Sequence, residues 1–319
     1  IGTMHELAHS YQAINRPGEA NRLLQQVFDR LHGMFGPDHP ETLKAAHCLA
    51  KSLISLNRQP EARDTLKVIL EQQRASLGHD DPATLDTMSR LAITYFKLGE
   101  YEVAADRHKE VLQLRRARFG ENDPAILASM SEIALCQAQL QRHDEAIETL
   151  TGLLSKFQDI RGADHRETLN IKNNLAKTCW TAGRIEDAVR HYEDAIDQME
   201  KSLGSEDRMT LGCKAYYAWL LTTIPDYQNP DRALELAKES VRTAPGNPWH
   251  LRTLGAAQLR NGQFNEAIDS LKRSLQIRND LGDCTDFFLL SIAEAKRGHR
   301  DDAMFCYRTA VNAMDKNPE

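Results

Sequence analysis

The sequence predicts an all-α fold: a right-handed superhelical solenoid of about eight helix-turn-helix repeats with no sheet. Three sets of landmarks, each recurring at a fixed interval of 42 residues, predict it. The first set is the pentapeptides HPETL (39–43), DPATL (81–85), DPAIL (123–127), HRETL (165–169) and DRMTL (207–211). The second set is the glycines Gly36, Gly78, Gly120, Gly162 and Gly204. The third set is the alanines Ala20, Ala62, Ala104, Ala146 and Ala188. Self-similarity at a period of this size is the signature of stacked helical repeats.

Each landmark has a structural reason. Asp81 and Asp123 stand where an N-cap carboxylate accepts from free N–H groups, and Pro82 and Pro124 follow at the first helical position. The glycine ends the preceding helix, where a left-handed residue is needed. The alanine lies in the second helix, where a small side chain allows close helix approach. Each period therefore reads as helix A, tight turn, helix B and loop, which predicts about sixteen helices in eight pairs.

These repeats resemble the tetratricopeptide family, whose motif has a large apolar residue at position 7, a small one at 8, often an aromatic at 11, Gly near 15 and Ala at 20. The third repeat matches this motif with Leu91, Ala92, Tyr95, Gly99 and Ala104. The resemblance extends over the whole chain. It implies a fold of packed helical pairs and a role in binding other proteins.

The repeat length changes along the chain. Residues 1–224 form the long repeats, and residues 225–319 contain an irregular turn and then repeats near the standard length of about 34 residues. Eight extra residues add about one turn to each helix of a long repeat. The turn at 224–231 carries about three extra residues, including Pro225 and Pro230, and we expect it to be irregular. The two stretches are expected to continue as one solenoid.

The long repeats resemble those of kinesin light chains. A long array followed by standard repeats also resembles the regions attached to bacterial serine/threonine protein kinases. The chain begins at Ile1 without an initiator Met, so we expect it to be a piece of a longer protein that continues upstream with further helical pairs.

Composition excludes several classes of partner. The net charge of -6 and the pI near 6.1 argue against nucleic-acid binding, which favours a basic stripe. No apolar run approaches the ~20 residues that span a bilayer. The six cysteines form no CxxC pair, so neither a zinc site nor a disulfide framework is predicted, and a cytoplasmic location fits best.

Two motifs imitate catalytic ones. His5-Glu6-Leu7-Ala8-His9 spells the zinc-protease pattern HExxH, but Leu7 and Ala8 are the packing positions of the first repeat, and no third ligand follows at the family spacing. Adventitious metal binding there stays open. The triplet 299–301 spells HRD but lacks the Asn of a kinase catalytic loop and falls in an interhelical turn. We therefore predict no catalysis, no metal, no cofactor and no small-molecule substrate.

The binding site is predicted from the helical register. The face of each helix A opposite its packed stripe lines the concave groove of a curved array. The register places Lys44, His47, Lys51, Asp86 and Trp249 there. The predicted partner-binding residues on or beside this face are Arg90, Phe96, Lys97, Asn173, Asn174, Lys177, Trp180, Tyr216, Trp219 and Arg252.

Aromatic side chains turned away from the core favour a binding role, although they could instead cover neighbouring helices. Asn173, Asn174 and Lys177 resemble the residues with which some tetratricopeptide proteins clamp a peptide carboxylate. Ser131 and Leu135, at matching positions of the fourth repeat, lack that chemistry.

The predicted function is a protein-interaction scaffold that holds a peptide or a partner protein in the concave groove, or docks a folded partner on its outer face. The alternative is a substrate-recruiting or regulatory region of a larger bacterial serine/threonine protein kinase, whose catalytic domain lies outside this chain. An inert spacer is the third possibility, and it requires a groove without distinctive residues.

Overall fold

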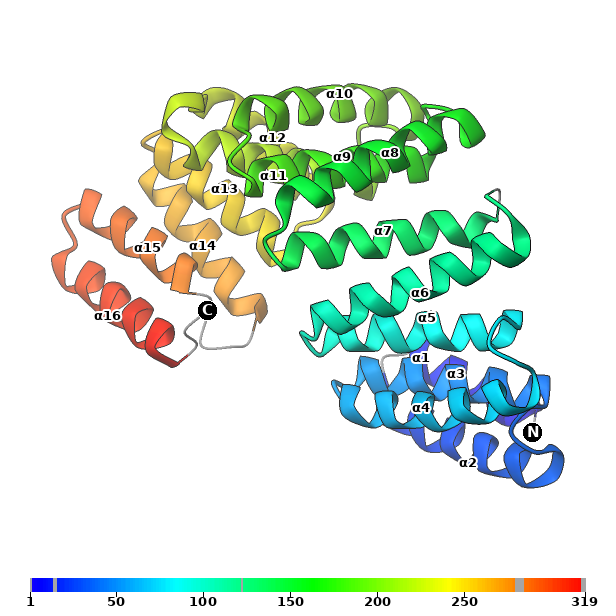
Figure 1. The fold of residues 1–319 in the computed structure, drawn as a ribbon. Helices are drawn as coiled ribbons and strands as arrows, with labels where there is room; N and C mark the ends of the chain where they lie inside the picture. The colour runs from blue at the N-terminus through cyan, green and yellow to red at the C-terminus, as the bar shows by residue number, and fades with distance from the viewer. Residues whose placement is uncertain (1, 14–15, 122, 279–283, 317–319) are drawn as a thin grey trace. The chain divides into compact units, whose positions relative to one another are not determined.

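The computed structural model describes residues 2–13, 16–121, 123–278 and 284–316, and within them the chain is helical with no β-strand (Figure 1). The A helices are α1 (Gly2–Ala13), α3 (Pro40–Ser55), α5 (Pro82–Lys97), α7 (Pro124–Gln139), α9 (Arg166–Thr181), α11 (Arg208–Thr223), α13 (Pro248–Arg260) and α15 (Cys284–Lys296). The B helices are α2 (Pro17–Phe35), α4 (Gln59–Ser76), α6 (Tyr101–Phe119), α8 (His143–Arg161), α10 (Ile185–Leu203), α12 (Pro230–Thr243), α14 (Phe264–Arg278) and α16 (Arg300–Lys316). The predicted sixteen helices in eight pairs are confirmed.

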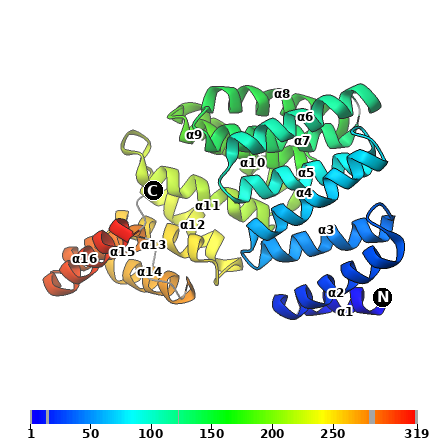
Figure 2. The same cartoon turned by 60° about the horizontal axis from the view of Figure 1, so that its bottom comes forward.

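The chain divides into two compact units, unit 1 (residues 1–156) and unit 2 (residues 157–319). In unit 1, helices α1 to α7 pack in the order of the sequence and share a core that extends from Ala8 to Cys136. In unit 2, helices α9 to α16 follow the same rule (Figure 2). The A helices also contact one another within a unit: α5 contacts α3 and α7 in unit 1, and α9, α11, α13 and α15 contact in sequence in unit 2. The A helices of a unit therefore form one continuous layer.

The N-caps recur at the predicted interval. Asp81 accepts a hydrogen bond from the Ala83 N–H at 2.9 Å, and Asp123 accepts one from the Ala125 N–H at 3.0 Å. Asp207 caps α11 in the same way. Histidine Nδ1 atoms replace the carboxylate at the starts of α3 and α9. An acceptor at this position satisfies one free N–H group and fixes where each A helix begins.

The glycines and alanines also lie as predicted. The φ angles of Gly36, Gly78, Gly120, Gly162 and Gly204 lie between 77° and 95°. This is the left-handed region, which glycine adopts at the least cost. The five alanines at the same interval are fully buried, from Ala20 to Ala188. Because the alanines lie in the B helices, their small side chains allow each B helix to approach its partner closely.

The change of repeat length is visible in the helices. Helices α3, α5, α7, α9 and α11 have 16 residues each, whereas α13 and α15 have 13. The difference is about one helical turn, as expected. The predicted irregular turn is also present: between α11 and α12 the chain forms a short 3-10 helix, η1 (Pro225–Tyr227).

Candidate partner-binding surfaces

In unit 1 the predicted residues lie on α5. Arg90 donates from Nε to Asp86 Oδ2 at 3.1 Å. Phe96 is half-buried, packs against the core of unit 1 and meets the ring of Tyr101 edge-on, with the ring centroids 5.1 Å apart. Lys97 is exposed, and its charge lowers the pKa of Glu132 on α7, although burial raises that pKa above its usual value overall. Phe96 therefore covers a neighbouring helix, while Arg90 and Lys97 present charges.

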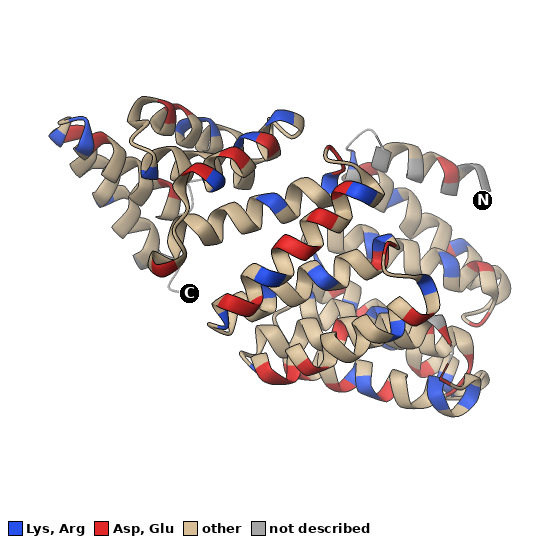
Figure 3. Ribbon diagram, turned by 90° about the horizontal axis from the view of Figure 1, so that it is seen from above, with Lys and Arg blue, Asp and Glu red and all other residues tan. Residues whose placement is uncertain are grey.

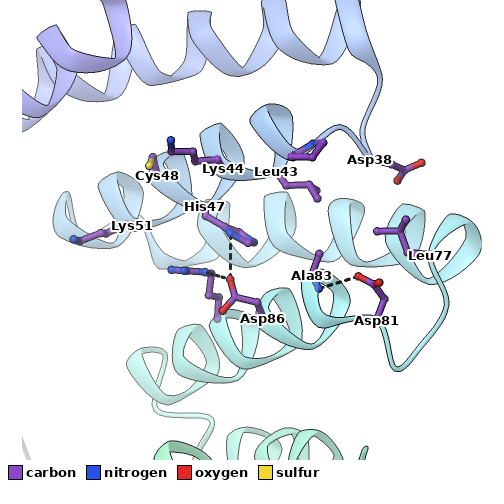
Figure 4. A pocket seen from close by; sticks show the side chains of 12 residues that line it. Asp38, Leu43, Lys44, His47, Cys48, Lys51, Leu77, Asp81, Ala83 and Asp86 are labelled. Atoms are coloured by element: carbon purple, nitrogen blue, oxygen red, sulfur yellow. Dashed lines mark hydrogen bonds and ion pairs between the residues drawn. The ribbon is translucent and has the colours of Figure 1, made fainter. Parts of the chain in front are cut away.

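An open pocket of about 640 Å³ lies beside Arg90, between α3 and α5 (Figure 4). Lys44, His47 and Lys51 line it from α3. His47 Nε2 lies 2.9 Å from Thr87 Oγ1, and His47 Nδ1 lies 3.4 Å from Asp86 Oδ2. Burial and the charge of Arg90 lower the pKa of His47 to about 4, so its ring is neutral at pH 7. The register placed these side chains on one face, but it gave no indication of a pocket.

In unit 2 the predicted residues on α9 and α11 come together around a residue of α13. Lys177 Nζ lies 4.9 Å from the centroid of the Tyr216 ring. The Trp249 ring contacts both Tyr216, at a centroid distance of 5.5 Å, and Trp219, at 5.3 Å. Tyr216, Trp219 and Trp249 are half-buried, and we call them the aromatic cluster. The cluster joins two adjacent A helices, and Lys177 extends it to a third.

The remaining predicted residues of α9 flank Lys177 along the same helix. Asn173 is half-buried, and its side-chain oxygen is enclosed without a hydrogen-bond partner in the part of the chain that the structure describes. Asn174 is half-buried as well, and its main-chain carbonyl accepts a hydrogen bond from Thr178 Oγ1. Trp180 is half-buried one turn beyond Lys177. These positions are compatible with partner binding, which stays a prediction for all three.

The register placed Arg252 among the partner-binding residues on the open face of its helix, and the structure shows its side chain buried instead. It is only 4% exposed, and it holds Asp286 of α15 through two hydrogen bonds of 2.8 Å, from Nε and from Nη2. Its guanidinium also lies 5.8 Å from the Trp249 ring centroid. Arg252 is therefore not a free cation on the binding surface: it ties α13 to α15 and supports Trp249 from within the protein.

The motifs that imitate catalytic sites have structural explanations or fall outside the described residues. The side chains of His5 and His9 lie outside that part of the structure. His299 stands in the turn before α16, where its Nδ1 lies 2.9 Å from Glu294 Oε2. Glu294, His299 and Asp302 place ligand atoms within 4.8 Å of one another. However, Glu294 also faces Lys272 at 3.5 Å, and a cation there disfavours a metal ion.

Charges of both signs are distributed along the helices. Figure 3 shows Lys and Arg interspersed with Asp and Glu on most of them. None of the described helices combines the length and the apolar composition that crossing a membrane requires.

The chain matches known proteins through its repeats. Sequence models of the tetratricopeptide repeat match residues 1–41, 61–117, 125–201 and 251–285. A search of curated proteins gives no match.

Several solved structures share the fold. One crystal structure of a Podosopora anserina putative kinesin light chain with nearly identical TPR-like repeats is 24% identical, with a TM-score of 0.57 over 63% of this chain and 95% of that one. BtubC (BKLC) from P. vanneervenii is 21% identical, with a TM-score of 0.58 over 69% and 91%. A tetratricopeptide repeat protein from Parabacteroides merdae is 15% identical, with a TM-score of 0.61 over 92% and 98%. At these identities the likeness concerns the fold alone.

Proposed function

Because the chain belongs to the tetratricopeptide repeat family, we propose that it is a protein-interaction scaffold that binds a segment of a partner protein across the A helices of unit 2, and that it performs no catalysis of its own. Proteins of this family typically bind other proteins on the surfaces that stacked repeats create. The observation that carries the proposal is the aromatic cluster.

The aromatic cluster has the composition and the rigidity of a binding hot spot. Trp and Tyr are enriched at the centres of protein interfaces, where their truncation costs about 2 kcal/mol or more. Trp249 contacts both Tyr216 and Trp219, so the rings are held in place before a partner arrives. Ordering such side chains in advance reduces the entropy lost on binding. Their half-burial leaves part of each ring for contact with a partner.

Neighbouring residues favour a segment that carries an apolar or aromatic side chain. Lys177 is exposed at the edge of the cluster, and its ammonium group lies over the Tyr216 ring. Gly212 lies one turn before Tyr216 on α11, and nothing stands within 4 Å of where its Cβ would be. This leaves room for a partner to approach the backbone of α11. An apolar side chain seated between Trp219 and Tyr216 would remove the exposed ring surface from water.

Selection from a displayed peptide library tests this proposal. Peptides enriched on the wild-type protein are expected to bind the Trp219→Ala variant about tenfold more weakly, while its melting temperature changes little. The same is expected of Trp180→Ala. Phe305→Ala is the matched control, because Phe305 is an aromatic residue of unit 2 that is 69% exposed on α16, outside the A-helix layer. Equal binding by wild type and both tryptophan variants would refute the proposal.

The alternative predicted from the sequence, a recruiting or regulatory region of a bacterial serine/threonine protein kinase, stays a prediction. The open reading frame upstream of Ile1 tests it directly, since kinase motifs are unmistakable in sequence.

A further inference from the structure

The pocket between α3 and α5 in unit 1 has cationic and acidic ends (Figure 4). Lys44 and Lys51 lie on α3 at the end of the pocket with Cys48, and Arg90 lines the pocket from α5. Asp38 and Asp81 stand at the other end, where Asp81 already caps α5. An anion that enters the pocket is therefore directed toward these three cations.

Lys44, Lys51 and Arg90 all line this pocket, and the charge of each acts on the Cys48 thiol. Burial raises the pKa of the Cys48 thiol above its usual value, while Arg90, Lys44 and Lys51 each act in the opposite direction by attracting the thiolate. Neither Lys44 nor Lys51 has an ion-pair or hydrogen-bond partner among the described residues. Both ammonium groups are thus available to a ligand.

Arg90 is held in position by Asp86, which lies one turn earlier on α5. Its Nε donates to Asp86 Oδ2 at 3.1 Å, and Asp86 lies 3.4 Å from His47 Nδ1. The two terminal nitrogens of Arg90 have no partner among the described residues, so they remain for a ligand. A guanidinium supported in this way is better positioned than a free surface arginine.

The charge around these cations matches a dianion. Lys44, Lys51 and Arg90 carry three positive charges, Asp86 carries one negative charge, and His47 is neutral because its pKa is about 4. The excess is two positive charges. A phosphomonoester carries about −1.5 to −2 charges at pH 7 and offers three acceptor oxygens. A carboxylate has one charge and two oxygens, which a single arginine already satisfies.

We propose that this pocket binds a phosphomonoester group on a segment of a partner protein, with Lys44, Lys51 and Arg90 as its ligands. The proposal rests on the proposed scaffold function and names the chemistry of a partner for unit 1. We expect the partner's residues on either side of the phosphate to be neutral or basic, because acidic residues would be repelled by Asp38 and Asp81 at the far end of the pocket.

Fluorescence anisotropy with a degenerate phosphoserine and phosphothreonine peptide library tests the proposal, alongside the same library without phosphate and with Glu in its place. We expect binding of the phosphorylated library only. Binding should fall about tenfold or more in Arg90→Gln and in the double variant Lys44→Gln/Lys51→Gln. Arg107→Gln is the control, because it removes the same charge from an exposed site on α6 of unit 1. Unchanged circular dichroism melting shows that the variants fold.

Four outcomes would overturn the proposal. Equal binding of the Glu library would assign the pocket to carboxylates. Competition by inorganic phosphate at the same concentration as the peptides would assign it to free phosphate rather than a protein segment. Absence of phosphopeptide binding, while displayed peptides still bind through Trp219, would refute this proposal and leave the scaffold function intact. Phosphopeptide binding lost in Trp219→Ala and retained in Arg90→Gln would place the phosphate at the aromatic cluster instead.

Discussion

Units 1 and 2 are built from the same helical pair, yet their A-helix faces carry different chemistry. The capping positions keep one role at every interval of 42 residues, with Asp or His accepting from the backbone. A position on the face does not: in successive repeats it is occupied by Cys48, Arg90, Glu132, Asn174 and Tyr216. Helix capping restricts which residues can occupy the capping positions. The positions on the face are not restricted in this way, so their residues can differ according to the ligand. Both proposed binding sites lie on these variable faces.

The two faces differ in the kind of side chain they carry: charged residues in unit 1 and aromatic residues in unit 2. Unit 1 surrounds a pocket with lysines and an arginine, and unit 2 gathers three aromatic rings beside one lysine. The two faces should therefore respond differently to substitution, pH and salt, and four measurements examine that difference.

The largest effect is expected from Arg252→Ala in unit 2. This change leaves Asp286 buried and unpaired at 0% exposure, and breaking a buried ion pair in this way costs about 3–5 kcal/mol. Thermal unfolding followed by circular dichroism measures the loss. Arg242→Ala is the control, because its ion pair with Glu206 is 67% exposed on both sides and should contribute little. A melting temperature equal to that of Arg242→Ala would contradict a structural role for Arg252.

Arg252 also marks where the sequence alone is insufficient. Caps, turn glycines and buried alanines are local features, so Asp81, Gly78 and Ala62 were predictable from their neighbours and their spacing. The role of Arg252 depends on Asp286, which lies 34 residues away on the next A helix. The register indicates which face of a helix a residue lies on. It does not separate the part of that face that remains open from the part that contacts the next A helix.

The aromatic cluster and the pocket illustrate the same limit. The register placed Trp249 on the same face as Trp219, but it could not indicate that Trp249 contacts both Tyr216 and Trp219. It likewise grouped Lys51 with Arg90, and the pocket between them depends on how α3 and α5 pack. The residue types at a site were thus predictable, whereas the contacts among them required the structure.

A second prediction concerns acid sensitivity, which should be greater in unit 1. His108 on α6 is 2% exposed, and neither ring nitrogen has a hydrogen-bond partner among the described residues. Burial lowers its pKa to about 4 from the usual 6.5. Between these values the unfolded chain binds a proton that the folded protein does not, so stability is complete above pH 6.5 and falls as the pH drops toward 4. The loss amounts to roughly 3 kcal/mol.

His108→Leu tests this dependence with a matched residue. The equivalent positions one repeat before and one repeat after are Leu66 and Leu150, which are 0% and 3% exposed, so leucine fits the site. Urea unfolding of the variant between about pH 4 and pH 7 should show a shallower decline in stability than the wild type. His47 in unit 1, whose pKa is also about 4, should account for part of the decline in stability that the variant still shows. An identical decline in both proteins would exclude His108 as the cause.

A third prediction compares two glycines within helices. Gly255 on α13 occupies the small-residue position of its repeat, and an added Cβ would lie 2.6 Å from Leu271 Cγ and 3.3 Å from the Ala267 carbonyl oxygen. Gly255→Ala should therefore destabilise unit 2 by about 1–3 kcal/mol. Gly152 on α8 has nothing within 4 Å of that point, so Gly152→Ala should stabilise the protein by up to about 1 kcal/mol. Thermal melts that shift in the same direction for both variants would contradict the close packing of α13 on α14.

The smallest effect, and the most direct contrast between the two faces, is expected from salt. Binding at the pocket of unit 1 depends on full charges in an open site, where the screening length falls from about 10 Å at 0.1 M salt to about 3 Å at 1 M. Phosphopeptide affinity should accordingly fall about tenfold over that range of sodium chloride.

Binding at the aromatic cluster depends on removing ring surface from water, which salt does not screen, and only Lys177 contributes a charge. The affinity of peptides selected there should change less than about twofold, since an exposed ion pair is worth less than about 1 kcal/mol. Anisotropy titrations of both peptide classes on the same protein preparation measure how steeply each affinity falls with salt concentration. Equal slopes would mean that both peptides bind through charges, and the distinction between the two faces would then fail.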